Sequence, residues 1–358
     1  MYTQNKELDF KGQSIFIGID VHLKNWTVTI RMKDLHLKTF SMDPSPELLY
    51  RHLIQHYPGA DYRNVYEAGF CGFWVHRELE KRGINGIVAN PLDIPSTNKE
   101  KRRKGDRVDS SKLSRELANG DLIGIYVPDI FHEQLRSFCR LYSREVEHLR
   151  RIKCRIRSHL HSYGIEIPIR SELSPWTARF IAWLETVEFS HAPGKAYLSE
   201  CIEELKEAKI RIHRIVKTLR DYSREEPIRR IVRDYLMSVP GVGFITAILF
   251  YSEIIDMKRF GDFDHLAAYV GFIPDVEGSG DREVTLGLTR RQNRYLRYLL
   301  IEAAWVAVRK DPAMTQKFGE LTKRMSKQMA IVRIAKKLLS RMRRVWLNEK
   351  HYSFGLVG

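Results

Sequence analysis

The segment that most constrains the fold is a short apolar run at residues 14–20, Ser-Ile-Phe-Ile-Gly-Ile-Asp, which ends in an acid. A run of this length and composition predicts a buried central strand with Asp20 at its tip. Residues 26–32 alternate apolar and polar side chains, which predicts an antiparallel neighbouring strand. A third strand is expected at residues 38–42.

Strand and helix patterns alternate along the rest of the first third of the chain. The expected strands are residues 64–67 and 84–89, and the expected helices are residues 46–57, 74–82 and 109–119. Three strands followed by alternating helices and strands indicate an α/β domain with a mixed sheet flanked by helices. We expect this domain to span residues 1–128.

Two long amphipathic runs follow, at residues 131–163 and 195–222. Apolar side chains recur in both at steps of three and four, with a shorter helix expected between them at residues 176–187. Residues 129–225 therefore read as an antiparallel coiled-coil hairpin that acts as a spacer or an oligomerisation arm. A basic helical face that also contacts nucleic acid is the alternative.

Residues 226–358 are expected to form a mostly helical domain. Its expected helices are residues 228–237, 244–254, 263–269, 289–308 and 329–347, with a loop or hairpin at residues 271–287.

The charge of the chain indicates a polyanionic partner. Its 358 residues include 60 Lys and Arg and 44 Asp and Glu, a formal net charge of +16, and 43% are hydrophobic. This composition fits a folded protein of two or three domains that binds nucleic acid. No run approaches the roughly 18 apolar residues of a membrane span. Without a signal peptide or CxxC spacing among Cys71, Cys139, Cys154 and Cys201, we expect a reduced, cytoplasmic, nucleoid-associated protein.

Four acids form the first candidate site. Asp106 and Asp109 lie three residues apart, so a helix that begins there places both on one face. Asp20 and Glu67 end two expected strands, and all four could converge at one sheet edge. Crowded carboxylates need cations between them, and two Mg²⁺ ions roughly 3.5–4 Å apart, with Mn²⁺ as a substitute, would suit a phosphodiester. Alternatively, each acid is an ordinary cap or a solvated turn residue.

Several basic or glycine-rich segments are candidate nucleic-acid contacts. The turn at residues 238–243 leads into a helix and resembles a helix-hairpin-helix motif, although an ordinary helical corner fits equally well. Arginines at positions 290, 294 and 297 are expected to share one helix face. The candidate residues are Lys101, Arg102, Arg103, Lys104, Arg107, Gly241, Gly243, Arg290, Arg291, Arg294 and Arg297. A further segment, Gly278-Ser279-Gly280-Asp281, reads by itself as a turn.

Taken together, these motifs resemble the DEDD-type transposases of bacterial insertion sequences that include the Piv/MooV invertases (insertion-sequence family 110), described as bridge-RNA-guided recombinases. The resemblance covers nearly the whole chain. It rests on Gly18-Ile-Asp20, Tyr66-Glu67-Ala-Gly69, Asn90-Pro91, Lys104 to Lys112, Val239 to Gly243, Tyr269 to Pro274, Gly278-Ser279-Gly280 and Asn293 to Arg297. The family pattern before the basic helix runs Lys-x-Gly-Asn, and this chain lacks that glycine at Gln292.

The resemblance implies a RuvC-like, RNase H-like first domain in which Asp20, Glu67, Asp106 and Asp109 are catalytic Mg²⁺ ligands. It also implies that Ser279 is a nucleophile that forms a transient 5′-phosphoserine linkage to DNA. A structured guide RNA would select donor and target DNA by base pairing, and homodimers would assemble into tetramers. The alternatives are a RuvC-like hydrolytic nuclease or resolvase, in which Ser279 is structural, and a non-catalytic nucleic-acid-binding protein.

Overall fold

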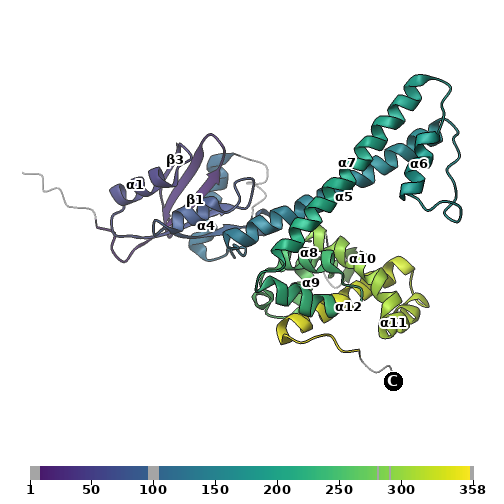
Figure 1. Cartoon of the computed structure of the whole chain (residues 1–358). Coiled ribbons are helices and arrows are strands. Elements are labelled where there is room, and N and C mark those ends of the chain that lie inside the picture. Colours follow the sequence, from purple (N-terminus) through teal and green to yellow (C-terminus); the bar gives the residue numbers. More distant parts are fainter. Residues whose placement is uncertain (1–8, 96–104, 280–281, 290–291, 355–358) are drawn as a thin grey trace, which may run out of the picture. The chain divides into compact units, whose positions relative to one another are not determined.

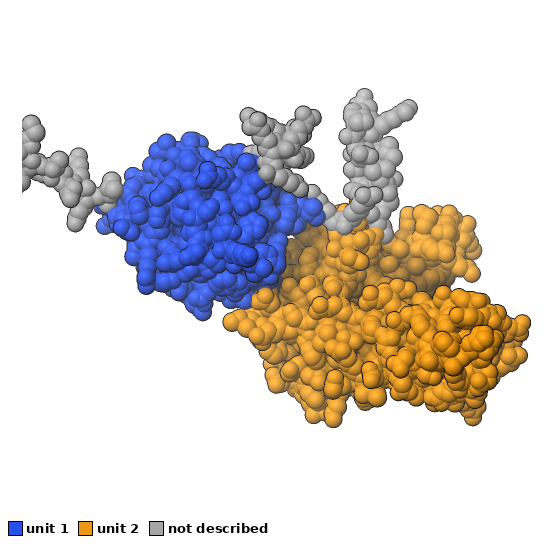
Figure 2. Space-filling view, turned by 90° about the horizontal axis from the view of Figure 1, so that it is seen from above, with its two compact units in different colours: residues 1–127 blue, residues 128–358 orange. Residues whose placement is uncertain are grey.

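The computed structural model describes residues 9–95, 105–279, 282–289 and 292–354, with the backbone alone for residues 275–288. The chain divides into two units, Met1–Val127 and Pro128–Gly358, which Figure 2 shows in blue and orange. The three-domain division expected from the sequence, with boundaries near 128 and 225, stays a prediction.

The first unit contains a five-stranded mixed sheet. Its strand order is β3-β2-β1-β4-β5, antiparallel from β3 to β1 and parallel from β1 to β5. The mixed sheet and flanking helices expected for this unit are therefore confirmed. The elements are β1 (Ser14–Val21), β2 (Trp26–Met32), β3 (Leu35–Met42), α1 (Pro46–His56), β4 (Asp61–Glu67), α2 (Trp74–Glu80), β5 (Asn85–Ala89), a 3₁₀ turn (Pro91–Asp93) and α4 (Asp106–Asn119).

The central strand β1 has two different faces. Ile15, Ile17 and Ile19 are fully buried in a core that also contains residues of α1 and α2. Because side chains alternate along a strand, Gly18 and Asp20 belong to the opposite face. Helix α4 packs on this opposite face, against β1, β2 and β4. Figure 1 shows α4 next to β1.

Glycine at position 18 allows α4 to approach the sheet closely. A Cβ atom at Gly18 would lie 2.1 Å from the Ser110 carbonyl oxygen and 2.5 Å from the Ser114 nitrogen, both on the α4 backbone. The Ser110 hydroxyl is 2.9 Å from the Thr29 hydroxyl, and Thr29 pairs with Gly18 across β1 and β2. This contact fixes where the N-terminus of α4 meets the tip of β1.

The second unit contains two long helices and a helical core. Helices α5 (Ile130–Ser162) and α7 (Ala192–Tyr222) run antiparallel, and α6 (Ala178–Thr186) lies beside one end of the pair (Figure 1). The Arg211 side chain lies 3.3 Å from Glu145, and the His159 ring lies 3.0 Å from the Gly194 carbonyl oxygen, which sets their register. The helices are where the amphipathic pattern places them, whereas a coiled-coil assembly stays a prediction.

The core of this unit surrounds α8, whose Phe250, Tyr251 and Ile254 are almost completely buried.

Within the described ranges, no helix is both long and apolar enough to cross a lipid bilayer. The remaining elements are a π-helical turn (Arg230–Tyr235), a 3₁₀ turn (Leu236–Ser238), α8 (Phe244–Ile254), a 3₁₀ turn (Met257–Arg259), α9 (Phe263–Val270), β6 (Pro274–Ser279), β7 (Arg282–Leu288), α10 (Arg294–Lys310), α11 (Pro312–Thr322) and α12 (Lys327–Asn348).

Two sequence expectations for this unit were wrong in detail. The helix expected at residues 289–308 begins only at Arg294, because the Asn293 side chain accepts a hydrogen bond from the Leu296 nitrogen and caps it. Arg290 lies outside the described residues, so a helix face shared by Arg290, Arg294 and Arg297 stays a prediction. Residues 230–238 form π and 3₁₀ turns rather than a regular α-helix.

The contact at Gly18 leads to a stability prediction. Replacing Gly18 with Ala should lower the free energy of unfolding by about 2 kcal/mol or more, because the new methyl group overlaps the α4 backbone. Urea denaturation followed by circular dichroism measures this change. Gly69→Ala is the matched control, since the nearest atom to its added Cβ is 3.9 Å away. Equal stability of the two variants would show that α4 does not need this close approach.

Candidate active site

The four predicted acids lie on three segments of the first unit. Asp20 is the next-to-last residue of β1, Glu67 is the last residue of β4, and Asp106 and Asp109 lie in the first turn of α4. β1 and β4 are adjacent parallel strands, so their carboxyl ends share one edge of the sheet. Docking of α4 against β1 brings all four carboxylates into one electrostatic cluster, which we call the acid cluster.

Histidine 22, which the sequence reasoning missed, belongs to this cluster. Its Nε2 atom lies 3.3 Å from an Asp20 carboxylate oxygen and 3.7 Å from one of Asp106. Within the described parts of the chain, ligand atoms of Asp20, His22 and Asp106 lie within 4.8 Å of one another. A signal for His22 was present in the sequence, because residues two apart in extended chain point to the same side.

Lysine 112 lies in the other half of the acid cluster. Its Nζ atom is 3.5 Å from Asp109 Oδ1 and 3.9 Å from Glu67 Oε1. Its side chain is only 11% exposed, because it follows Asp109 by one helical turn on the side of α4 that faces the sheet. The cluster therefore contains four carboxylates and two cationic or potentially cationic side chains.

Burial and the neighbouring carboxylates both raise the pKa values of two of the acids. Burial raises the pKa of Asp20, and the Asp106 and Asp109 carboxylates raise it further, against the lowering effect of His22. Burial also raises the pKa of Glu67, and Asp109 and Asp20 add to this effect while Lys112 opposes it. The charged forms of these carboxylates are thus disfavoured unless a further cation is present.

The donor set fits a divalent metal ion. Two carboxylates and an imidazole lie at ligand spacing, two further carboxylates are close by, and mutual repulsion favours an added positive charge. A hollow of about 420 Å³ beside them is lined by His22, Leu23, Lys24, Asn25, Phe70 and Asp106. Leu23 and Phe70 are 81% and 64% exposed, so apolar groups border the hollow next to the carboxylates.

The segment that carries Ser279 is a β-hairpin in the second unit. Ser279 is the last residue of β6 and pairs with Arg282 of β7, so the hairpin expected at residues 271–287 is confirmed. Gly280 and Asp281 lie outside the described residues, and only the backbone of Ser279 is described. Its role as a nucleophile stays a prediction.

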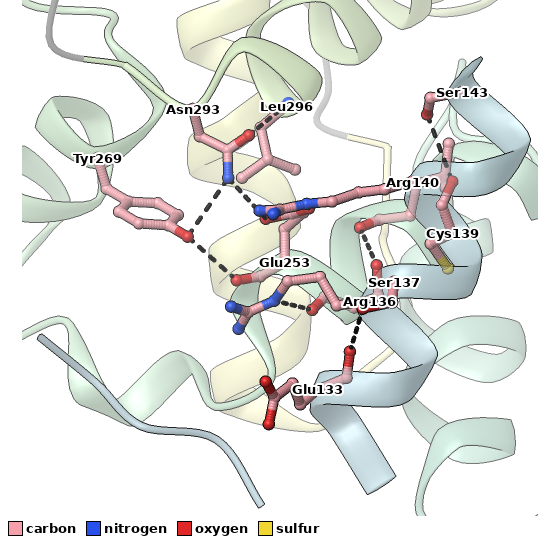
Figure 3. A network of polar contacts seen from close by, with 12 residues as sticks. Glu133, Arg136, Ser137, Cys139, Arg140, Ser143, Glu253, Tyr269, Asn293 and Leu296 are labelled. Carbon is pink, nitrogen blue, oxygen red and sulfur yellow. Dashed lines mark hydrogen bonds and ion pairs between the residues drawn. The ribbon is translucent and has the colours of Figure 1, made fainter. Parts of the chain in front are cut away.

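A buried carboxylate joins the two ends of this hairpin to α5 (Figure 3). Glu253 of α8 is 3% exposed, and Arg140 of α5 donates to both of its carboxylate oxygens at 2.7 and 3.0 Å. The Asn293 side chain donates to Glu253 Oε2 at 2.8 Å and to the Tyr269 hydroxyl at 3.3 Å. The Asn293 backbone nitrogen also donates to the Tyr269 carbonyl oxygen at 3.0 Å. Since Tyr269 precedes β6 and Asn293 follows β7, these bonds fix both ends of the hairpin.

A second arginine of α5 lies next to this network. Arg136 of α5 donates to the Ser252 carbonyl oxygen at 3.2 Å, and burial lowers its pKa. Together, Arg136 and Arg140 connect the first part of the long helix α5 to Ser252 and Glu253 near the end of α8.

The basic residues predicted to contact nucleic acid fall into three groups. Arg107 and Arg294 are exposed, so their guanidinium groups are accessible to a partner. The Arg297 guanidinium donates to the Thr289 carbonyl oxygen at 3.2 Å and to Gln292, so it helps to close the hairpin end. The others lie outside the described residues: Lys101, Arg102, Arg103, Lys104, Arg290 and Arg291.

The turn at residues 240–243 has a clear structural role. Gly241 has a φ of +92°, and a Cβ atom there would lie 2.7 Å from the Ala307 nitrogen and 2.8 Å from the Ala303 carbonyl oxygen of α10. Only glycine fits this approach without displacing α10. Gly243 is exposed and directly precedes α8 as its N-cap residue. A phosphate contact at Gly241 and Gly243 stays a prediction.

Comparison with known proteins finds a similarity in the segment that contains the hairpin. Residues 233–319 match the model of the Transposase IS116/IS110/IS902 family. A Sinorhizobium fredii protein named as a transposase, y4qE, is 29% identical over 245 residues, which cover 67% of this chain and 57% of y4qE. The matched segment thus spans little more than half the length of that relative.

Two further relatives are named for insertion sequences. The transposase for insertion sequence element IS1111A of Coxiella burnetii is 26% identical over 70% of this chain and 66% of its own length. The transposase for insertion sequence element IS1533 of Leptospira borgpetersenii is 25% identical over 82% of this chain and 85% of its own length.

The acid cluster predicts an unusual response to a neutral substitution. Because the folded environment raises the pKa of Asp20, its ionised form costs stability that Asn does not. In chelator at neutral pH, Asp20→Asn should therefore melt at a higher temperature than the wild type. In chelator, the stability of the wild type should also fall as the pH rises from the ordinary Asp20 pKa through its raised value.

Added Mg²⁺ should make the wild type melt at a higher temperature than Asp20→Asn, because a ligand that binds only the folded state stabilises it. Differential scanning calorimetry should show the wild type shifted upward by Mg²⁺ and Asp20→Asn shifted much less. Asp34→Asn, an exposed turn variant, is the control and should follow the wild type. A wild type that melts at the same temperature with Mg²⁺ and with chelator would contradict the metal assignment.

The Glu253 network predicts a large loss of stability on truncation. Glu253→Ala should lower the free energy of unfolding by about 2–3 kcal/mol, because it leaves Arg140 and Asn293 without their buried acceptor. Chemical denaturation measures this loss. Glu320→Ala, which removes an exposed ion pair with Lys317, should change stability little. Similar small effects in both variants would argue that the network is not a structural anchor.

Proposed function

We propose that this chain is a DNA transposase that moves an insertion sequence, with its acid cluster and Ser279 serving strand cleavage and exchange. The match of residues 233–319 to a transposase family supports the reaction class. The observation that carries the proposal is the convergence of Asp20, Glu67, Asp106 and Asp109 from three separate segments of the first unit. Carboxylates grouped in this way suit metal-dependent chemistry at a phosphodiester.

The topology of the first unit supports an RNase H-like, RuvC-like fold. Its strand order is 3-2-1-4-5, and the central strand carries one acid while its parallel neighbour carries another. In this proposal the four acids hold Mg²⁺, for which Mn²⁺ could substitute. When bound, the metal would polarise the scissile phosphate and stabilise the leaving 3′ oxygen.

The chain itself would supply the nucleophile. The Ser279 hydroxyl would attack the phosphorus, forming an Oγ–P bond and breaking the P–O3′ bond, with the departing 3′ oxygen taking up a proton. The 5′-phosphate of the DNA then remains on the serine, so the ester retains the bond energy for rejoining to a new 3′ end. The anchoring of the hairpin ends by Glu253 and Asn293 supports this role, since a nucleophile must be held in position.

The nucleic-acid partners are proposed from charge and shape. A net charge of +16, exposed Arg107 and Arg294, and the hollow beside the acid cluster suit DNA backbones and a structured guide RNA. Phe70 and Lys24 at this hollow could stack on a base and contact a phosphate. Homodimers that assemble into tetramers are part of the same proposal, with the α5–α7 pair as the oligomerisation arm.

A hydrolytic nuclease is the second candidate. The acid cluster and its adjoining hollow lie wholly within the first unit, so water activated there could cleave a strand without Ser279. In that case the hairpin serine would have only a structural role.

A denaturing gel distinguishes the two candidates. Purified protein with co-purifying RNA and Mg²⁺ is incubated with end-labelled DNA that carries the ends of the element. We expect a labelled band at the mass of the protein in the wild type, absent with chelator, with Ser279→Ala and with Asp106→Ala. Ser171→Ala, an exposed loop variant, is the matched control and should form the adduct. Ribonuclease treatment should abolish the adduct if the RNA guides cleavage.

Other outcomes select other functions. Free cleaved DNA without an adduct, unchanged in Ser279→Ala but lost in Asp106→Ala, would establish the hydrolytic nuclease. DNA binding without any cleavage in the wild type would indicate a binding protein and reject both enzymatic proposals.

A further inference from the structure

Two side chains divide the acid cluster into two pairs of carboxylates. The His22 imidazole lies between Asp20 and Asp106, at 3.3 and 3.7 Å. The Lys112 ammonium lies between Asp109 and Glu67, at 3.5 and 3.9 Å. Each pair therefore already has one nitrogen group placed between its oxygens, and the two groups differ in what they can do for a metal ion.

We propose that this site binds a single divalent ion with His22 as a nitrogen ligand beside Asp20 and Asp106, while Lys112 takes the place of a second ion. The proposal rests on the metal-dependent function proposed above. It narrows the carboxylate ligands of that function from four acids to Asp20 and Asp106, and it departs from the two-Mg²⁺ arrangement expected from the sequence.

The position of His22 suits direct coordination. Ligand atoms bound about 2.1 Å from one ion lie roughly 3–3.5 Å from their nearest neighbours, which is close to the observed separations. The loop that carries His22 is held by a hydrogen bond from its backbone nitrogen to the Asn25 carbonyl oxygen at 3.2 Å. The His22 side chain is 47% exposed and borders the hollow, so an ion and its water ligands can enter.

A nitrogen ligand also changes which ion the site prefers. Mg²⁺ takes oxygen ligands almost exclusively, whereas imidazole suits first-row transition metals such as Fe²⁺, Ni²⁺ and Zn²⁺, and Mn²⁺, the first ion of that series, accepts a nitrogen ligand more readily than Mg²⁺ does. We therefore infer that the site prefers Mn²⁺ over Mg²⁺ more strongly than a site made of carboxylates alone.

Lysine 112 opposes a second ion by position and charge. An ammonium group has three N–H donors and no lone pair for a metal ion, and that of Lys112 already contacts Glu67 and Asp109. Because the Lys112 side chain is 11% exposed and lies on the sheet-facing side of α4, it has little room to adopt another conformation. A divalent ion between the same two carboxylates would repel it at short range.

Manganese binding to the intact protein tests the proposal without relying on activity. Pulsed electron paramagnetic resonance of bound Mn²⁺ detects a directly coordinated imidazole through its ¹⁴N modulation, and equilibrium dialysis gives the number of ions per chain. We expect one Mn²⁺ per chain with ¹⁴N modulation in the wild type. His22→Gln should lose the modulation and weaken Mn²⁺ affinity by about tenfold or more. His36→Gln, at an exposed histidine of β3, is the control and should retain both properties.

Removing the lysine tests the second half of the proposal. Lys112→Gln should raise the number of bound Mn²⁺ ions from one to two per chain, because the position between Glu67 and Asp109 becomes available. Lys81→Gln, which removes an exposed lysine in the same unit, should still bind one ion.

The outcomes separate this inference from the proposed function. Bound Mn²⁺ without ¹⁴N modulation, or two ions per wild-type chain, would overturn the inference and leave the metal-dependent function intact. Folded wild-type protein that binds no Mn²⁺ or Mg²⁺ would overturn both. The wild-type measurements alone decide these points, so a variant that fails to fold does not block the test.

Discussion

The close packing of α4 on β1 is the contact on which the candidate site depends. Gly18 leaves no Cβ atom between the strand and the α4 backbone, and the Thr29–Ser110 hydrogen bond fixes the register of the two elements. Only in that register do the first turn of α4 and the tip of β1 bring Asp106 close to Asp20. The packing of α4 on β1 thus offsets the electrostatic repulsion between the carboxylates of the acid cluster.

The second unit fixes its hairpin by a comparable principle. A buried carboxylate, Glu253, accepts hydrogen bonds from Arg140 and Asn293, while Tyr269 bonds to Asn293 through both its hydroxyl and its carbonyl oxygen. Both ends of the hairpin are therefore tied to the core. In each unit the candidate catalytic residues are carried by segments that buried neighbours hold in place, which is the arrangement that catalytic positioning requires.

The elements that could be predicted from the sequence are those with local signals. The apolar run before Asp20 and the three-residue spacing of Asp106 and Asp109 anticipated the acid cluster, because strand ends and helix faces follow from periodicity. The two-residue spacing of Asp20 and His22 indicates one side of the chain for both, but the approach of His22 to Asp106 and the contacts of Lys112 arise only when α4 docks on the sheet. The start of α10 was misplaced because the capping bond of Asn293 outweighed the continuous helical pattern before it. Glu253 gave no local signal, since its partners lie 113 and 40 residues away along the chain.

The central claim is that the acid cluster holds a divalent ion next to bound nucleic acid. Fe²⁺ in place of Mg²⁺, with ascorbate and peroxide, generates hydroxyl radicals that cleave only groups close to the ion. We predict polypeptide cuts near residues 20–22, 67 and 106–109, and cuts in bound DNA confined to a few neighbouring nucleotides. Cuts in the DNA without cuts in these segments, or no localised cleavage of either molecule, would contradict a metal-dependent active site at this edge of the sheet.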